Sequence, residues 1–290
     1  MQWLPLLVSL AAAAIVAPAV VRGLGERGLM RANYRGALVA FPAGIAIPAA
    51  ALLALVPLAL LAELASAEVF GPDAGAVATY VLGVALLGLL DDLVAGAQPP
   101  THAAGGPAAS QPRGWRGHAR ATISGGFSTG ALKAVGSLAL ALFVLAGRGL
   151  DASEYLLAVG VLVLATNLLN LLDLRPGRSI KALVVLGTAL TLVGGVEPLR
   201  ALGLFAAPAL VLLPFDLGER AMLGDTGSNV VGAVAGLWLV LALSPAGQVA
   251  ALGLIALLTI YGEFRSLSSL IERTPLLRRL DSLGRRSADA

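Results

Sequence analysis

The stretch "YLLAVGVLVLATNLLNLL" (155–172), followed directly by "DLRPGRSIK" (173–181), indicates the fold class of this chain. The first part is almost entirely apolar, and its length is close to the roughly 20 residues that an α-helix needs to cross a bilayer. The second part brings a carboxylate and several cations immediately after that helix. These features predict a membrane-spanning helix that ends in a charged segment.

The rest of the chain repeats this alternation of apolar runs and short charged segments. Of its 290 residues, 58% are hydrophobic and only 13% are charged, whereas about 25% of the residues in a soluble domain are charged. The chain is therefore predicted to be an all-α, polytopic membrane protein. Its Lys and Arg residues lie between the apolar runs, so the net charge of +3 reflects membrane topology and anionic ligands, and nucleic acid is not expected as a partner. The absence of cysteine excludes disulfides and thiolate chemistry.

The apolar runs predict about nine transmembrane helices. With the N-terminus outside the cell, this number places every Lys and Arg on the cytoplasmic side except Arg148 and Arg200, as the positive-inside rule favours. The C-terminus is then cytoplasmic, and the protein is expected to be a multi-pass protein of the cell (plasma) membrane. The predicted spans are 3–21, 38–61, 75–90, 130–147, 155–172, 182–196, 201–215, 229–243 and 248–262.

Two segments are not predicted to span the membrane. Residues 96–122 are rich in Pro, Gly and Ala and are expected to form a flexible cytoplasmic loop within a membrane domain of residues 1–263. Residues 264–290 are expected to form a cytoplasmic amphipathic helix and a tail. In "FRSLSSLIERTPLLRRLDSLGRR" (264–286), leucines recur at helical spacing between basic residues, which is typical of a helix at the membrane interface.

Adjacent carboxylates close the third predicted span. Asp91 and Asp92 repel each other and lose hydration next to hydrocarbon, so the pair is costly. A divalent cation or a phosphoryl-transfer site accounts for such a pair. The alternative is that one carboxylate caps a helix.

A third carboxylate, Asp225, lies in "AMLGDTGSNVVG" (221–232), between two apolar runs. Gly224 and Gly227 permit a tight turn, and nearby hydroxyls and backbone amides can bind an anion at the start of the next helix. Asp225 is therefore a candidate metal ligand beside an anion cradle. The alternative is a simple N-cap of that helix.

Polar residues also close the span at 155–172. Asn167, Asn170 and Asp173 recur every three positions, so they lie on neighbouring turns, and Arg175 and Arg178 follow directly. Amides in membrane helices often bond only to neighbouring helices. However, the cation-based topology brings all three acidic segments to one membrane face. Oxygen ligands of this kind suit Mg²⁺ or, alternatively, Mn²⁺, and the neighbouring arginines suit phosphates.

Lys133 lies three residues into the fourth predicted span and is a further candidate for ligand binding. The alternative is that its long side chain extends only to the membrane interface.

Three of these segments together resemble a known family. "GLLDDL" (88–93), "NLLNLLD" (167–173) and "MLGDTGSN" (222–229), in this order and at these membrane positions, resemble the polyprenyl-phosphate sugar-1-phosphate transferase superfamily. Its members include phospho-N-acetylmuramoyl-pentapeptide transferase and the enzymes that place N-acetylglucosamine-1-phosphate on undecaprenyl or dolichyl phosphate. The resemblance covers roughly residues 20 to 281.

The resemblance implies an Mg²⁺-dependent transfer at the cytoplasmic face. A polyprenyl phosphate attacks the β-phosphate of a UDP-sugar, which yields a polyprenyl-diphosphate sugar and UMP in the first membrane step of an envelope glycopolymer. Homodimers occur among family members. The residue roles that it implies are Asp91 as base toward the lipid phosphate, Asp92 as its partner and a metal ligand, Asp225 as principal Mg²⁺ ligand, Asn170 and the catalytic Asp173 near the metal and nucleotide, and Lys133 at a phosphate. Asn167 is a further candidate for ligand binding.

The chain also departs from the family pattern. Members commonly read D-G-x-D-G where this chain has "DLRPGR" (173–178), and many carry a histidine cluster where Arg278 and Arg279 stand here. Arginine neutralises a diphosphate but does not readily transfer a proton near neutral pH. The tenth span of the family is not found either. The alternatives are a transporter or flippase for an anionic lipid-linked compound, and a non-catalytic family member.

Overall fold

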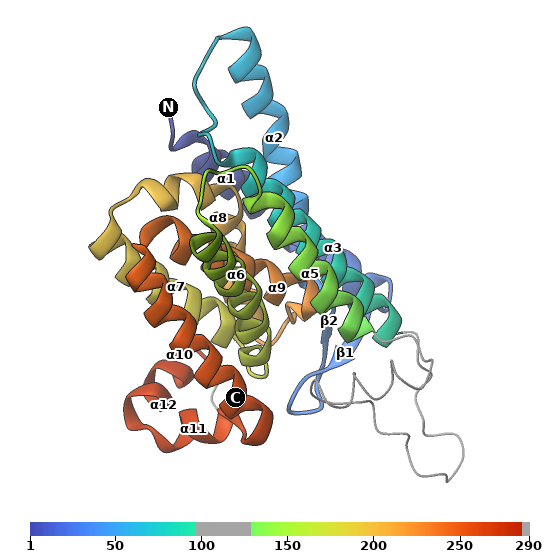
Figure 1. Cartoon of the computed structure of the whole chain (residues 1–290). Coiled ribbons are helices and arrows are strands. Elements are labelled where there is room, and N and C mark those ends of the chain that lie inside the picture. The colour runs from blue at the N-terminus through green and yellow to red at the C-terminus, as the bar shows by residue number, and fades with distance from the viewer. Residues whose placement is uncertain (97–128, 286–290) are drawn as a thin grey trace.

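A computed structural model describes residues 1–96 and 129–285, and within them the chain is helical apart from one short β-hairpin (Figure 1). The predicted flexible loop at 96–122 lies outside these residues except for Gly96. The elements are α1 (Leu4–Glu26), β1 (Met30–Ala32), β2 (Leu38–Ala40), the 3-10 helix η1 (Ala43–Ile45), α2 (Ala46–Leu64), α3 (Ala74–Gly96), α5 (Thr129–Leu145), α6 (Ala152–Leu172), α7 (Arg178–Gly194), α8 (Glu197–Leu217), α9 (Gly224–Ala242), α10 (Pro245–Phe264), α11 (Leu267–Arg273) and α12 (Pro275–Ser282).

Each of the nine predicted apolar runs coincides with a helix of the bundle. Among the described residues, seven helices are long and apolar enough to cross a membrane: α1, α2 together with η1, α3, α6, α8, α9 and α10. Helix α5 is apolar but shorter, and α7 begins with the polar residues "RSIK". The structure therefore supports a polytopic, multi-pass membrane protein. The number of nine spans and their orientation stay predictions.

The second predicted span begins later than expected, because the residues at its start form the hairpin. Strand β2 pairs with β1 in antiparallel register, and the side chain of Asn33 closes the turn by accepting bonds from two backbone amides that follow it. The hairpin also holds the segment that leads into α9, since the amide of Met222 donates to the carbonyl of Ala40 at 3.0 Å.

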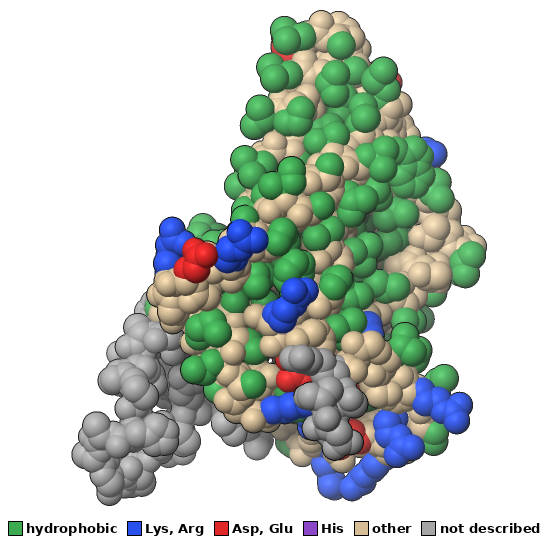
Figure 2. Space-filling model, turned by 180° about the vertical axis from the view of Figure 1, so that it is seen from behind, with side chains coloured by type: hydrophobic (Ala, Val, Ile, Leu, Met, Phe, Trp, Pro, Cys, Tyr) green, Lys and Arg blue, Asp and Glu red, His purple; other side chains and the backbone are tan. Residues whose placement is uncertain are grey.

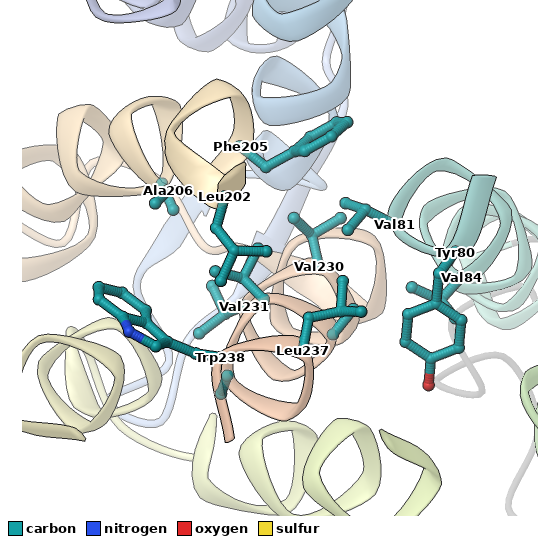
Figure 3. Packing of buried hydrophobic residues seen from close by; sticks show 14 of the residues in the cluster. Tyr80, Val81, Val84, Leu202, Phe205, Ala206, Val230, Val231, Leu237 and Trp238 are labelled. Carbon is teal, nitrogen blue, oxygen red and sulfur yellow. The ribbon is translucent and has the colours of Figure 1, made fainter. Parts of the chain in front are cut away.

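Helix α9 is the centre of the bundle. Its residues 226–239 are all buried, and it packs against α3, α6, α7 and α8. Figure 3 shows its apolar side chains between those of α8 and those of α3; the labelled residues are Val230, Val231, Leu237 and Trp238 of α9, Leu202, Phe205 and Ala206 of α8, and Tyr80, Val81 and Val84 of α3.

Helix α6 approaches α9 closely at two glycines of α9. A Cβ atom added at Gly232 would lie 2.6 Å from the Cα of Thr166, and one at Gly236 would lie 3.1 Å from the Cα of Leu162. Glycines spaced by four residues are the usual means by which membrane helices bring their backbones together. This contact fixes the end of α6 relative to the start of α9.

The predicted C-terminal amphipathic helix is divided into two short helices, α11 and α12. Pro275 has no backbone N–H and disfavours helical backbone at the preceding residue, so Thr274 is extended. In Figure 1 both helices lie at the bottom of the bundle, opposite the N-terminus.

We expect Gly232→Ala to lower the stability of the bundle, because the new Cβ would meet backbone atoms of Thr166 that cannot move without separating α6 from α9. Overpacking of this kind costs about 1–3 kcal/mol. Thermal unfolding in detergent, followed by tryptophan fluorescence, measures the change. The matched control is Gly253→Ala in α10, where the added Cβ has no neighbour within 4 Å. Equal melting temperatures for the two variants would contradict the packing role of Gly232.

Candidate functional site

The polar ends of four helices meet around the ammonium group of Lys133, near the start of α5. Its Nζ atom lies 3.3 Å from Oδ2 of Asp91 in α3 and forms a second ion pair with Asp225 in α9. Asn170, near the end of α6, offers its amide oxygen to the same Nζ at 3.0 Å. We call these four residues the Lys133 cluster. Because a buried ammonium group needs acceptors, Lys133 draws together three segments that are far apart in the sequence.

The amide of Asn170 is held in one orientation by its neighbours. With its oxygen toward Lys133, its nitrogen donates to Oγ of Ser228 at 2.7 Å and lies 3.3 Å from Oδ1 of Asp225. The hydroxyl of Ser228 in turn donates to the carbonyl of Gly224 at 2.9 Å. This orientation is assigned from the hydrogen-bond network, and it satisfies both the oxygen and the nitrogen of the amide.

Asp92 does not point into the cluster, although it follows Asp91 directly. Its two oxygens accept three bonds from the first turn of α9, from the amide of Asp225 at 2.9 Å and from the amide and hydroxyl of Thr226 at 2.8 and 2.6 Å. A carboxylate here satisfies amides that have no partner within the helix and interacts favourably with the helix dipole. In this structure Asp92 thus caps α9, and its expected role as a metal ligand and catalytic partner stays a prediction.

Glycines make this close approach of α3 and α9 sterically accessible. Gly224 adopts a φ of +69°, and a Cβ there would lie 2.8 Å from Oδ2 of Asp92. A Cβ at Gly88, one turn before Asp92 on α3, would lie 2.4 Å from the carbonyl oxygen of Asp225. Larger residues at either position would push Asp225 away from Lys133.

A pocket of about 750 Å³ opens beside the cluster, between the hairpin, the ends of α6 and α8, and the start of α9. This volume lies within the range of small-molecule sites in proteins. Its polar lining comes from both membrane helices and loops and includes Asn33, Asn170, Asp173, Arg175, Asp216 and Asp225.

Asp173 caps the C-terminus of α6 and lines this pocket. Burial raises the pKa of its carboxyl group well above the ordinary value, and repulsion from Asp216 and Asp225 raises the pKa further. The pocket wall thus concentrates carboxylates beside the Lys133 cluster. A ligand that brings a cation with it would relieve this repulsion.

Arg175, a predicted phosphate-binding residue, lines the pocket. Its guanidinium lies 4.4 Å from the centre of the Tyr34 ring, which is favourable cation–π geometry. Tyr34 belongs to the turn of the hairpin, so the hairpin and the segment after α6 meet over the pocket. The guanidinium of Arg175 also lies 3.4 Å from Oε1 of Glu272.

Arg178 was expected to bind phosphate, but its donors are engaged elsewhere. It is buried and donates to both oxygens of Asp281, at 2.9 and 3.0 Å, and to the hydroxyl of Ser268 at 2.8 Å. This paired geometry is the strong, specific form of an arginine–carboxylate contact. Arg178 therefore connects α11 and α12 to the bundle, and its expected contact with phosphate stays a prediction.

Three further expected binding residues lie outside the cluster and the pocket. Asn167 is exposed on the surface of α6, one helical turn before Asn170, and Arg278 and Arg279 are exposed on α12. None of the three lines the pocket beside the cluster. The structure gives no contact through which these side chains would reach a ligand there.

Asp216 was not identified from the sequence. It is buried at the end of α8 and accepts a bond from the amide of Gly177 at 2.7 Å, which holds the loop that carries Arg175. The sequence contains a signal for it, because "PFDLGE" (214–219) places a carboxylate at the end of an apolar run, as in the segments of Asp91 and Asp173.

The donor set fits Mg²⁺ only if the ligand contributes to its binding. Within residues 1–96 and 129–285, no three Asp, Glu or His side chains gather closely enough to hold a metal ion by themselves. Asp225 and Asp91 nevertheless share one cationic partner in Lys133. Mg²⁺ is commonly held by one or two carboxylates with phosphate oxygens and water completing its shell. Asp225 with Asp91 in reach therefore fits a metal ion that binds together with a phosphate ligand.

The chain matches no family model, and no curated protein is significantly similar to it.

We expect Asp92→Ala to destabilise the protein, because it removes three hydrogen bonds and leaves amides of α9 without an acceptor. An unsatisfied buried donor costs about 1–3 kcal/mol. The matched variant is Asp91→Ala, which leaves α9 capped and should lower the melting temperature much less. Thermal unfolding of both variants in detergent measures the difference. A larger loss for Asp91→Ala would overturn the capping assignment.

Acidification is expected to release α12. Burial alone would raise the pKa of Asp281, but hydrogen bonds from Arg178 and Arg285 outweigh it and hold the pKa below the ordinary value. A carboxyl group with a lowered pKa stabilises the folded state fully above about pH 4 and loses that contribution as the pH falls through its folded pKa.

Hydrogen–deuterium exchange of α12 between pH 6 and pH 3, corrected for intrinsic rates, checks this expectation. The wild type should lose protection only at the acidic end, whereas Asp281→Asn should show weak protection throughout. Protection that does not change with pH in the wild type would contradict the role of this ion pair.

Proposed function

We propose that this protein transfers a sugar-1-phosphate from a UDP-activated amino sugar to a polyprenyl phosphate such as undecaprenyl phosphate, with release of UMP. One observation carries the proposal. The three segments that resemble the transferase superfamily lie far apart in the sequence, and each supplies one member of the Lys133 cluster: Asp91, Asn170 and Asp225.

The proposed site lies at the cytoplasmic face of a nine-span topology with the N-terminus outside. In support, Asp91 and Asn170 lie near the C-terminal ends of their helices, and Asp225 lies at the start of α9. Figure 2 shows most of the Lys and Arg side chains visible in this view on the lower part of the molecule, below a largely hydrophobic surface. A transporter would be expected to place such charges near the middle of the bilayer.

The proposed reaction exchanges one phosphoanhydride bond for another. An oxygen of the lipid phosphate forms a bond to the β-phosphorus of the nucleotide sugar. The bridging bond to the α-phosphate breaks, and UMP leaves with the electron pair. Catalysis then depends on aligning two anions and neutralising their charge in a site that excludes water.

The residues of the cluster suit these requirements. Lys133 can donate to phosphate oxygens once a ligand competes for its carboxylate partners, and Asp91 can accept the proton of a lipid phosphate that binds in its monoprotonated form. Asp225 would be the principal ligand of Mg²⁺, which supplies charge neutralisation at the diphosphate. Arg175 at the pocket mouth is placed to contact the diphosphate of the donor.

The first test is UMP release from UDP-N-acetylglucosamine and other UDP-sugars with undecaprenyl phosphate and Mg²⁺. We expect Asp225→Asn and Asp91→Asn each to lower the rate by at least about 100-fold, since removal of one electrostatic group from an active site commonly has this effect. The control is Glu63→Gln, an exposed residue at the end of α2, which should leave the rate unchanged.

Two outcomes would overturn the proposal. One is a wild-type protein that releases no UMP with any UDP-sugar. The other is full activity of both aspartate variants, because the Lys133 cluster would then take no part in the reaction.

A further inference from the structure

Helix α12 is oriented with its apolar side outward. Four leucines lie on one side of it, because residues 276, 277, 280 and 283 follow helical spacing. Their exposed fractions are 67% for Leu276, 40% for Leu277, 42% for Leu280 and 68% for Leu283. We call these four side chains the leucine face. A contiguous apolar face of this kind on a folded protein marks a surface that is covered by another phase or molecule.

Two cations of α7 fix this orientation. Arg178 holds Asp281 of α12 through a paired contact. The ammonium group of Lys181 donates to the carbonyls of Leu280 at 3.0 Å and Leu283 at 3.2 Å, so it caps the end of the helix. Because its polar side is anchored to the bundle, α12 cannot turn its leucines inward without breaking these contacts.

Unpaired cations accompany the leucine face. Arg273, Arg278 and Arg279 are exposed, and none of them forms an ion pair with the described residues. Basic residues beside an apolar helix face are the combination that binds anionic lipid surfaces. They are less suited to a dry protein interface, where unpaired charges would be desolvated.

The position of α12 in the chain also favours lipid. It follows α10, one of the seven candidate spans, in which only Ile255 is buried. Helix α10 packs against α6 on one side, and on the other it exposes large apolar side chains such as Leu254, Leu257 and Ile260, where lipid would surround them. Helix α12 is attached at the end of this lipid-facing helix by a short segment that contains α11.

We propose that α12 lies in the headgroup layer of the bilayer, with the leucine face toward the acyl chains and Arg273, Arg278 and Arg279 on anionic lipid phosphates. Arg278 and Arg279 are then lipid-binding residues and do not replace the histidine cluster of the resembled family. This inference needs only that the protein is embedded in a membrane. It does not depend on the proposed transferase activity.

The absence of cysteine from the chain allows a direct test with single spin labels. Leu280→Cys places a label on the leucine face, and the matched control Ser282→Cys places one on the same helix outside that face. Each variant is reconstituted into vesicles of phosphatidylcholine alone or of phosphatidylcholine with phosphatidylglycerol. Collisions with oxygen and with a water-soluble nickel chelate then report the depth of the label. We expect the label at 280 to favour oxygen over nickel, more so with the anionic lipid, and the label at 282 to favour nickel.

A charge reversal tests the contribution of the arginines. Arg278→Glu combined with Arg279→Glu in the Leu280→Cys background should move the label toward water. We expect the ratio of its oxygen to its nickel collision rate to fall roughly tenfold or more in anionic vesicles, and much less in phosphatidylcholine.

Two results would overturn the proposal. In the first, nickel reaches both labels equally in both kinds of vesicle, which means that the leucine face is in water. In the second, labels at 280 couple to each other between molecules at low protein-to-lipid ratio, which means that a second copy of the chain covers the face. Neither result depends on UMP release, so failure here is distinguishable from failure of the transferase proposal.

Discussion

The Lys133 cluster depends on the contact between Asp92 and the first turn of α9. Helix α9 is enclosed by other helices, so water cannot satisfy the amides at its start, and an unpaired amide in an apolar bundle is costly. Asp92 supplies the acceptors from α3. Because the amide of Asp225 is one of the donors, the same contact that completes the helix also places the carboxylate of Asp225 beside Asp91 and Lys133. The small residues at 88 and 224 follow from this, since any larger side chain would lengthen the contact.

The charged groups of the Lys133 cluster and of the adjoining pocket differ in how far neighbouring charges of opposite sign neutralise them. In the Lys133 cluster one ammonium group serves two carboxylates and an amide. Asp173 and Asp216 add two further carboxyl groups on the adjoining pocket wall. Around the pocket, acidic groups therefore outnumber the cations close to them. In the Arg178–Asp281 pair, by contrast, each charge has a close partner of opposite sign. Incomplete compensation is costly for a purely structural site but useful for one that receives a cation together with an anionic ligand.

The sequence predicts the helices well and the site in part. Apolar runs are local signals, so each predicted span finds its helix, and the charge asymmetry of the loops brings Asp91, Asn170 and Asp225 to one end. The sequence does not separate Asp91 from Asp92, whereas in the structure the two carboxylates have different partners, because adjacent residues on a helix point about 100° apart. The hairpin was not predicted from the sequence, because β2 forms one of its backbone hydrogen bonds with Met222, which is far away in the sequence. The sequence could not distinguish Arg178 from the neighbouring cations, since its partner Asp281 lies in α12, beyond four further helices.

Burial, and not sequence position, decides what each cation of this chain does. Lys133 is enclosed by carboxylates at the ends of the membrane helices, Arg178 is buried in an ion pair that anchors α12, and Arg279 is exposed beside the leucine face. All three would count equally toward a positive-inside topology. They differ because the desolvation of a charge forces it to find a partner, whereas an exposed charge remains available to lipid or solvent. In "DLRPGRSIK" (173–181), Arg178 is buried in a structural ion pair, whereas Arg175, three residues earlier, lines the pocket.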